Sequence, residues 1–312
     1  MGHRLLALGE CMVELSPAED GDYCVGFAGD TFNTAWYARR IAPEATLDVA
    51  YFTTVGDDDQ SARMMRFMRD AGIDVHAGMV AGGTPGLYMI FLDEGERSFG
   101  YWRSDSAARR LADHLDLLPD LAPGDVAYFS GITVAILPPE GRTALLGRLR
   151  DCAQRGVTIA FDPNLRPRLW ASADDMRDWT MKAAGIARIV LPSFDDEAAV
   201  FGDTDPAATA ERYLENGARI AVVKNGPGAV LVKDRDGDGF QYLPEPVENI
   251  CDTTAAGDSF NAAFLVDYLE RNRLREAVRA GCALARHVIA HRGALVPVTR
   301  MDLSREKTAL PA

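Results

Sequence analysis

Apolar runs of strand length alternate with segments of helical periodicity along most of this chain. In the first part, strands are predicted at 4–8, 12–15 and 49–55, and an amphipathic helix at 59–71. Later strands are predicted at 126–130, 157–162, 189–192 and 220–224, with helices between them near 139–155, 174–184 and 205–216. Such alternation predicts a mostly parallel sheet covered by helices on both faces, with ligands bound beyond the carboxyl ends of the strands.

Two short apolar segments joined by a polar one predict a β-hairpin. Its strands are 87–92 and 98–102, joined by 93–97. Because side chains alternate between the faces of a strand, Tyr88, Tyr101 and Arg103 can project toward one face. No shift in composition marks a second domain, so residues 1–312 are predicted to form one α/β domain.

The stretch 252–260 is the strongest candidate for chemistry. Apolar residues recur at helical spacing after Asp258, which places Ala256, Gly257 and Asp258 on the first turn of a helix. The N–H groups of that turn have no partners within the helix, and small side chains leave them uncovered, so they can bind a phosphate. Asp258 can then act as general base for a hydroxyl that attacks the phosphate. The alternative is that Asp258 only caps the helix.

A glycine-punctuated loop at 26–35 opens another helix, which runs to about residue 40. Glycines let a small ligand approach the backbone closely. The alternative is an ordinary loop in which Asp30 or Thr31 caps the helix.

Charge and composition narrow the partners of the chain. Its 312 residues carry a net charge of -13, which argues against a nucleic-acid partner because such affinity comes from Lys and Arg meeting phosphates.

A hydrophobic content of 47% is enough for a large α/β core. The five cysteines are scattered and predict reduced thiols. No apolar run approaches a membrane span or a signal peptide, so the expected compartment is the cytoplasm.

Two patterns typical of metal sites are rejected from their contexts. Residues 234–239 with Glu245 match the spacing of a calcium-binding EF-hand loop, but the flanks at 229–233 and 240–243 predict strands, not helices. His287 and His291 lie four apart, but the glutamate of the H-E-x-x-H zinc motif is missing. The G-x-x-x-x-G-K-[ST] and G-x-G-x-x-G nucleotide motifs are also absent from the sequence.

Two of these stretches resemble the signatures of the ribokinase-like sugar kinases. Residues 252–260 are similar to D-T-x-G-A-G-D-x-F, with Ala255 where glycine is usual, and residues 29–33 are similar to the G-G-x-x-x-N segment. The resemblance implies an α/β, ribokinase-like three-layer sandwich with a mostly parallel central sheet. It also implies a small β-sheet lid over the sugar, with strands from about 11–27 and 75–103.

The resemblance also implies roles for single residues. Asp258 would be the base that activates the sugar hydroxyl, and the N–H groups of Ala255, Ala256 and Gly257 would hold the transferred phosphoryl group. Sugar hydroxyls would be bound by Gly29, Asp30 and Asn33. ATP would be bound by Asn164, Ser193, Lys224, Gly226, Gly228, Ala256, Gly257 and Cys282. Asp196 would orient Mg²⁺ through water, and a need for a monovalent cation such as K⁺ stays open.

Two further segments resemble a narrower group, the 2-keto-3-deoxygluconate kinases. They are Y-W-R-x-x-S-A-A at 101–108 and D-x-N-x-R-P-x-L-W at 162–170. The resemblance implies that Arg103 and Arg166, with the lid residues Tyr88 and Tyr101, bind the acid sugar, since a guanidinium fork matches a carboxylate. It also implies an ATP-dependent phosphorylation of 2-keto-3-deoxy-D-gluconate at the 6-hydroxyl, in Entner–Doudoroff or uronate catabolism.

Two other functions stay open. A kinase for a neutral sugar such as fructose or ribose would keep Asp258, but two guanidinium groups facing a hydroxyl would be costly to desolvate. A sugar-acid sensor without catalysis would keep the fold, and Asp258 with the small residues before it argues against that function. Lids of this kind often pair between subunits, so a homo-oligomer is expected, with neither a nucleic-acid nor a membrane partner.

Overall fold

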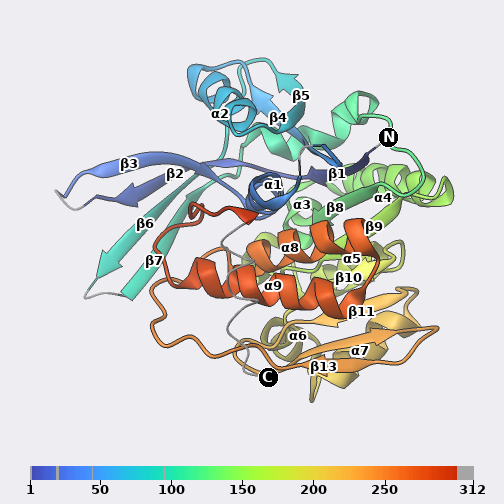
Figure 1. Cartoon of the computed structure of the whole chain (residues 1–312). Helices are drawn as coiled ribbons and strands as arrows, with labels where there is room; N and C mark the ends of the chain where they lie inside the picture. The colour runs from blue at the N-terminus through green and yellow to red at the C-terminus, as the bar shows by residue number, and fades with distance from the viewer. Residues whose placement is uncertain (1, 19–20, 44, 94–95, 301–312) are drawn as a thin grey trace.

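A long sheet of nine strands runs through the centre of the molecule in the computed structural model, which describes residues 2–18, 21–43, 45–93 and 96–300 (Figure 1). Its order is β13-β12-β11-β10-β9-β8-β1-β4-β5. The neighbours are parallel from β5 through to β11, while β12 is antiparallel to both β11 and β13, so the predicted mostly parallel sheet is confirmed. The strands are β1 (His3–Leu8), β4 (Leu47–Gly56), β5 (Asp74–Val80), β8 (Val126–Ser130), β9 (Thr158–Asp162), β10 (Ile189–Val190), β11 (Ile220–Val223), β12 (Val230–Asp234) and β13 (Phe240–Tyr242).

Helices cover both faces of this sheet and bury two separate apolar cores. Along β1, Leu5 and Ala7 pack into one core while Leu6 and Leu8 pack into the other, as the alternation of side chains requires. The first core holds α1 (Asp30–Ile41), α2 (Asp59–Asp70), α8 (Ala256–Arg271) and α9 (Leu274–Ile289). The second holds η1 (Ala107–Leu117), α3 (Gly131–Ile136), α4 (Pro139–Gln154), α5 (Ala173–Ala184) and α7 (Pro206–Glu215). Two short elements, η2 (Pro167–Leu169) and α6 (Phe194–Phe201), follow strands β9 and β10. The expected three-layer sandwich is therefore confirmed.

A second, four-stranded sheet projects from one side of the main sheet (Figure 1). Its order is β3-β2-β6-β7, with β2 parallel to β6 and antiparallel pairs on either side. The strands are β2 (Met12–Pro17), β3 (Tyr23–Ala28), β6 (Leu87–Asp93) and β7 (Glu96–Trp102). The predicted hairpin is therefore present, although positions 94 and 95 of its turn lie outside the described residues.

Two predicted boundaries of this small sheet are wrong. The range 75–103 was expected to belong to the lid, but residues 74–80 form β5, which pairs with β4 in the central sheet. The range 26–35 was expected to be a loop that opens a helix, but residues 26–28 continue β3 and pair with residues 12–14 of β2, in agreement with the lid range 11–27, and α1 already begins at Asp30. In both cases pairing with another strand supplies the backbone hydrogen bonds, and local residue preference does not reveal that partner.

Other expectations concern regions away from the small sheet. β12 and β13 form an antiparallel hairpin, so strands flank the rejected EF-hand pattern as predicted. All five cysteines are free thiols. Among the described helices, none has the length and apolar composition that crossing a membrane requires.

The chain enters α8 through a backbone conformation that alanine rarely adopts. Ala255 precedes the helix with φ 59° and ψ 15°, in the left-handed region. Asp252 fixes the approach, because its carboxylate accepts hydrogen bonds from the Thr254 N–H at 3.0 Å and the Gly293 N–H at 2.7 Å. The left-handed conformation costs an L-residue about 1–2 kcal/mol, so strain is located one residue before the first turn of α8.

We predict that Ala255→Gly raises the free energy of unfolding by about 1 kcal/mol, because glycine adopts a positive φ without steric cost. Urea denaturation of both proteins measures the difference. The matched control is Ala256→Gly, one residue further and inside the helix, which should lower the free energy of unfolding by up to about 1 kcal/mol. Equal losses in the two variants would contradict the left-handed assignment of Ala255.

Candidate active site

Helices α1 and α8 meet at the carboxyl edge of the central sheet, where two predicted side chains join. Asn33 Nδ2 donates a hydrogen bond to Asp258 Oδ2 at 2.8 Å, and Thr34 Oγ1 donates to the Asp258 carbonyl at 3.2 Å. Asn33 also accepts from the Gly29 N–H at 3.2 Å. A Cβ at Gly29 would lie 2.2 Å from the Glu10 carbonyl oxygen, so the start of α1 can approach this strand end only with glycine.

Asp30, the first residue of α1, is held by the segment that follows β9. Asn164 Nδ2 donates to Asp30 Oδ2 at 2.7 Å, and the Asn164 N–H donates to Asp162 Oδ1 at 3.0 Å. Asn164 has φ 36°, a conformation that asparagine tolerates better than most residues. The structure therefore brings Gly29, Asp30, Asn33, Asn164 and Asp258 together at one place.

The environment of Asp258 raises the pKa of its carboxyl group to about 7. Burial is the main cause, and the negative charges of Asp30 and Asp162 act in the same direction. The hydrogen bond from Asn33 and the charge of Lys224 oppose the shift. A carboxylate that is half ionised near neutral pH is suited to accept a proton from a hydroxyl.

The first turn of α8 presents backbone donors beside this carboxylate. The first bond of the helix runs from the Ser259 N–H to the Ala255 carbonyl at 2.9 Å, so the N–H groups before it have no partners four residues back. One of them, the Ala256 N–H, donates within the turn to the Thr253 carbonyl at 3.2 Å. The turn therefore has the geometry of the predicted anion site, with one of its donors already engaged.

A buried polar network lies beneath Asp258. Lys224 Nζ donates to Asp162 Oδ2 at 2.9 Å and to Asn261 Oδ1 at 3.3 Å. Asn261 Nδ2 in turn donates to Asp162 Oδ2 at 2.6 Å and to the Tyr128 hydroxyl at 3.1 Å. Sequence reasoning proposed Lys224 but missed Asp162 and Asn261 as site residues. Two sequence features could have indicated them, since Asp162 is an acid at the end of a buried strand and Asn261 is a polar residue within an apolar helix.

The predicted nucleotide-loop residues gather where β11 ends. Ser193 and Lys224 form an isolated parallel β-bridge outside the named strands. The Phe194 N–H donates to the Lys224 carbonyl at 2.8 Å. The following turn has Gly226 at φ 50° and a hydrogen bond from the Gly228 N–H to the Asn225 carbonyl at 2.7 Å. Glycine adopts this φ without steric cost, and a Cβ built on Gly226 would meet no atom within 4 Å, so the backbone of the turn is uncovered at this position.

Asp196, and not its neighbour Glu197, faces the site from α6. Asp196 lies 3.4 Å from Arg166, and burial raises its pKa even though Arg166 and Lys224 oppose the shift. Glu197 is fully buried between helices, where it accepts hydrogen bonds from Arg212 and Tyr213. Asp196 is therefore the acid of this helix that lies beside the site, where it pairs with Arg166, and its metal-orienting role stays a prediction.

The acidic residues of the site do not form a dedicated metal cage. The described ranges contain no group of three or more His, Cys, Asp or Glu side chains that could hold a metal ion. Mg²⁺ commonly binds through one or two carboxylates, several waters and substrate phosphates. Asp196, whose side chain is 41% exposed, fits that mode of binding.

The predicted lid tyrosines stand in one row across the small sheet. Tyr88 is opposite Glu14 on β2 and opposite Tyr101 on β7, and the two tyrosine rings are 6.0 Å apart. The Tyr88 hydroxyl donates to the Glu14 carboxylate. Tyr88 is buried in a small apolar cluster against which Ala255 packs, whereas Tyr101 is 50% exposed. This cluster, which joins residues of the small sheet to Ala294, therefore packs against the turn that leads into α8.

Arg103 follows the lid strand β7 and is paired with a carboxylate of the protein. Its guanidinium donates to Glu10, which is 2% exposed and also accepts from the Ser106 hydroxyl. Burial raises the pKa of Glu10, and its two partners oppose that shift. Arg103 and Arg166 were predicted to share one substrate carboxylate, and each has its own acidic partner here, Glu10 and Asp196. The sequence analysis did not propose Glu10 as a site residue, although an acid just after the first buried strand could have indicated one.

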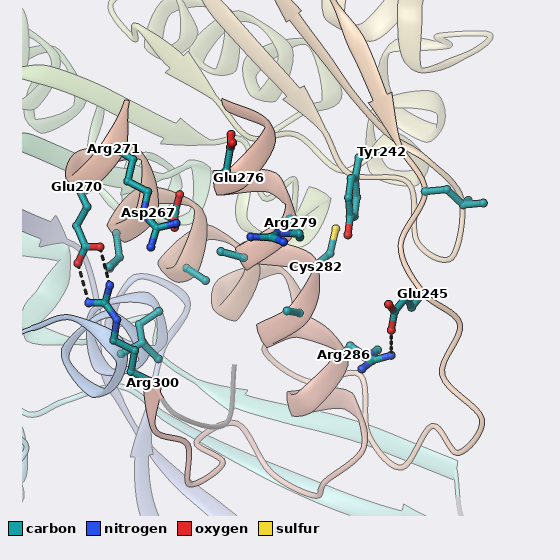
Figure 2. A pocket seen from close by; sticks show the side chains of 16 residues that line it. Tyr242, Glu245, Asp267, Glu270, Arg271, Glu276, Arg279, Cys282, Arg286 and Arg300 are labelled. Atoms are coloured by element: carbon teal, nitrogen blue, oxygen red, sulfur yellow. Dashed lines mark hydrogen bonds and ion pairs between the residues drawn. The ribbon is translucent and has the colours of Figure 1, made fainter. Parts of the chain in front are cut away.

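Cys282, predicted to border the nucleotide, lies in a cavity of about 420 Å³ along α8 and α9 (Figure 2). Tyr242, Glu245 and Arg286 line the same side of this cavity as Cys282, and Arg286 pairs with Glu245 (Figure 2). Burial raises the pKa of the Cys282 thiol to about 12, so it stays neutral. The lining of the cavity does not include Asp258, so Cys282 and the group around Asp258 occupy different places.

Comparison with known proteins agrees with this geometry. Residues 3–300 match the pfkB family carbohydrate kinases. The 2-dehydro-3-deoxygluconokinase of Haemophilus influenzae is 38% identical over 299 residues, 94% of this chain and 95% of that protein. The enzyme of the same name from Escherichia coli K12 is 36% identical over 305 residues, 95% of this chain and 98% of that protein.

A solved structure shows the same fold. The crystal structure of aminoimidazole riboside kinase from Salmonella enterica, complexed with aminoimidazole riboside and an ATP analog, superposes with a TM-score of 0.85 at 21% identity. The match covers 98% of this chain and 100% of that one. With the family match over nearly its whole length, and with the two predicted signatures joined through Asn33 and Asp258, this chain belongs to the pfkB family of carbohydrate kinases.

Proposed function

We propose that this protein transfers the γ-phosphoryl group of ATP to the 6-hydroxyl of 2-keto-3-deoxygluconate. The observation that carries the proposal is the position of Asp258 on the first turn of α8, where Asn33 holds its carboxylate at 2.8 Å. The two relatives at 38% and 36% identity are named for the phosphorylation of this sugar acid. A structural neighbour that binds an ATP analog supports ATP as the donor.

In this reaction Asp258 takes the proton of the sugar hydroxyl while the hydroxyl oxygen forms a bond to the γ-phosphorus. The bond from that phosphorus to the β,γ-bridging oxygen breaks, and ADP leaves. Backbone N–H groups of the α8 turn hold the negative charge of the transferred group. Mg²⁺, bound to the phosphates and oriented by Asp196 through water, would supply further positive charge.

The lid would keep water away from the γ-phosphorus. Tyr88 belongs to the apolar cluster that contacts Ala255, and Tyr101 lies beside it with an exposed ring. A sugar bound between the lid and α8 would complete this surface, so a water molecule could not take the place of the sugar hydroxyl.

Arg103 supports an acidic substrate. Its Nε is buried and has no hydrogen-bond partner among the described residues, although the same guanidinium is paired with Glu10. The guanidinium therefore retains donor capacity for a second carboxylate.

A neutral-sugar kinase is the second candidate. The observation that favours it is that Arg103 and Arg166 already have acidic partners within the protein, Glu10 and Asp196. In that case the arginines would neutralise the protein's own carboxylates and contribute nothing to substrate choice.

The comparison that separates the two candidates is ADP release from ATP and Mg²⁺ with 2-keto-3-deoxygluconate, fructose, ribose or no sugar. We expect turnover with the keto acid and at least about 100-fold lower kcat/KM with either neutral sugar, because the arginines would then face a hydroxyl. Turnover confined to a neutral sugar would keep the role of Asp258 and overturn the proposed substrate.

We predict that Asp258→Asn lowers kcat at least about 100-fold, the effect expected when a general base is lost. Because asparagine has nearly the same shape, the affinity for the keto acid measured by calorimetry should change by less than about tenfold. Near-normal turnover would remove Asp258 from the mechanism.

The raised pKa of Asp258 predicts an acid limb in the pH profile. Asp258 must be ionised to act as base, so kcat/KM should rise with pH and level off above about pH 8, with an apparent pKa of about 7. Asn33→Ala should move the limb to higher pH, because it removes a hydrogen bond that favours the ionised form. Glu197 also has a pKa of about 7, so Glu197→Gln is the control and should leave the limb in place. A limb below about pH 5 would contradict the assignment.

A further inference from the structure

A single lysine is buried among the carboxylates of the site. Lys224 is 9% exposed, and its ammonium contacts Asp162 at 2.9 Å and Asn261 at 3.3 Å, which are 4% and 0% exposed. An ammonium has three hydrogens to donate, and these two contacts account for two of them. A buried lysine with remaining donor capacity is costly unless a further acceptor completes its shell.

The ammonium of Lys224 lies directly against the turn that begins α8. A Cβ built on Gly257 would be 3.6 Å from Lys224 Nζ, so the glycine leaves the face of the turn open toward the ammonium. The lysine ammonium and the backbone donors of the turn therefore lie close to each other. Together they form a more positive surface than a helix end alone.

The charge of Lys224 reaches both acidic residues proposed for the reaction. It lowers the pKa of Asp258 on α8 and that of Asp196 on α6, against the effect of burial. Asp30 and Asp162 add negative charge to the same region. The site thus holds four carboxylates around one buried ammonium, before any phosphate has entered it.

We propose that Lys224 is a catalytic residue whose ammonium donates a hydrogen bond to a non-bridging oxygen of the phosphoryl group during transfer. This inference rests on the proposed kinase function. As the oxygen of the sugar forms its bond to phosphorus and the bond to the leaving ADP oxygen breaks, the ammonium and the α8 turn stabilise the charge on the transferred group. Lys224 keeps its proton throughout, and the proton of the hydroxyl goes to Asp258.

Asp162 and Asn261 are positioning residues in this arrangement. Asn261 accepts from Lys224 and donates to Asp162, so the two fix the position of the ammonium beside the first turn of α8. The competing explanation is that Lys224 only neutralises the buried charge of Asp162. The two explanations differ in what happens when both charges are removed together.

The experiment compares Lys224→Met, Asp162→Asn and the double variant, with wild-type protein as reference. Lys224→Met should lower kcat at least about 100-fold, the size expected for losing one transition-state donor. The Kd for a non-hydrolysable ATP analogue with Mg²⁺ should rise by less than about tenfold, because the contact is strongest during transfer. Lys224→Met should also unfold at a lower urea concentration, since it leaves Asp162 buried without its cation.

In the double variant, stability and kcat should respond differently. Replacing Asp162 as well removes the unpaired carboxylate, so stability should return toward that of Asp162→Asn, while kcat stays as low as in Lys224→Met. Recovery of kcat together with stability would overturn the inference and leave Lys224 as a structural partner of Asp162. Absence of turnover in the wild-type protein with every sugar would instead overturn the proposed function.

Discussion

Asp30, Asp162 and Asp258 come from three elements that are far apart in the chain, and their charges act on one another at the carboxyl edge of the sheet. Like charges at short range destabilise the folded state unless donors and cations compensate. Here each carboxylate has its own donor, namely Asn164 for Asp30, Asn33 for Asp258, and Asn261 with Lys224 for Asp162. These donors compensate the acids that meet at this edge, while burial, with the charges of Asp30 and Asp162, keeps the pKa of Asp258 near neutrality.

Packing contacts also connect the small sheet to the proposed reaction site. Gly29 lets α1 begin against the Glu10 carbonyl, and the Glu10 side chain pairs with Arg103 at the end of the lid strand β7. On the other side, the apolar cluster of Tyr88 reaches Ala255, which enters α8 in a strained left-handed conformation. The elements proposed to bind the substrate and the phosphate therefore contact common residues, so a change in one is expected to affect the other.

The sequence patterns located most strands and helices because these depend on local periodicity. They failed where pairing with another strand decides the structure, at residues 74–80, which pair with β4, and in the loop predicted from residue 26, where residues 26–28 pair with β2. They also missed Glu10, Asp162 and Asn261, whose importance comes from partners 93, 62 and 99 positions away in the chain. No local pattern reports such separations, because a single acid after a strand is equally compatible with a surface position.

The sequence by itself determined the three-layer α/β fold, the position of Asp258 on the first turn of a helix, and membership of the carbohydrate kinase family, since periodicity and contiguous motifs specify these features. Only the tertiary structure decided which charges meet. It paired Arg103 with Glu10, Arg166 with Asp196 and Lys224 with Asp162. The physical reason is that electrostatic interactions depend on distance and burial in three dimensions, whereas periodicity depends only on position along the chain.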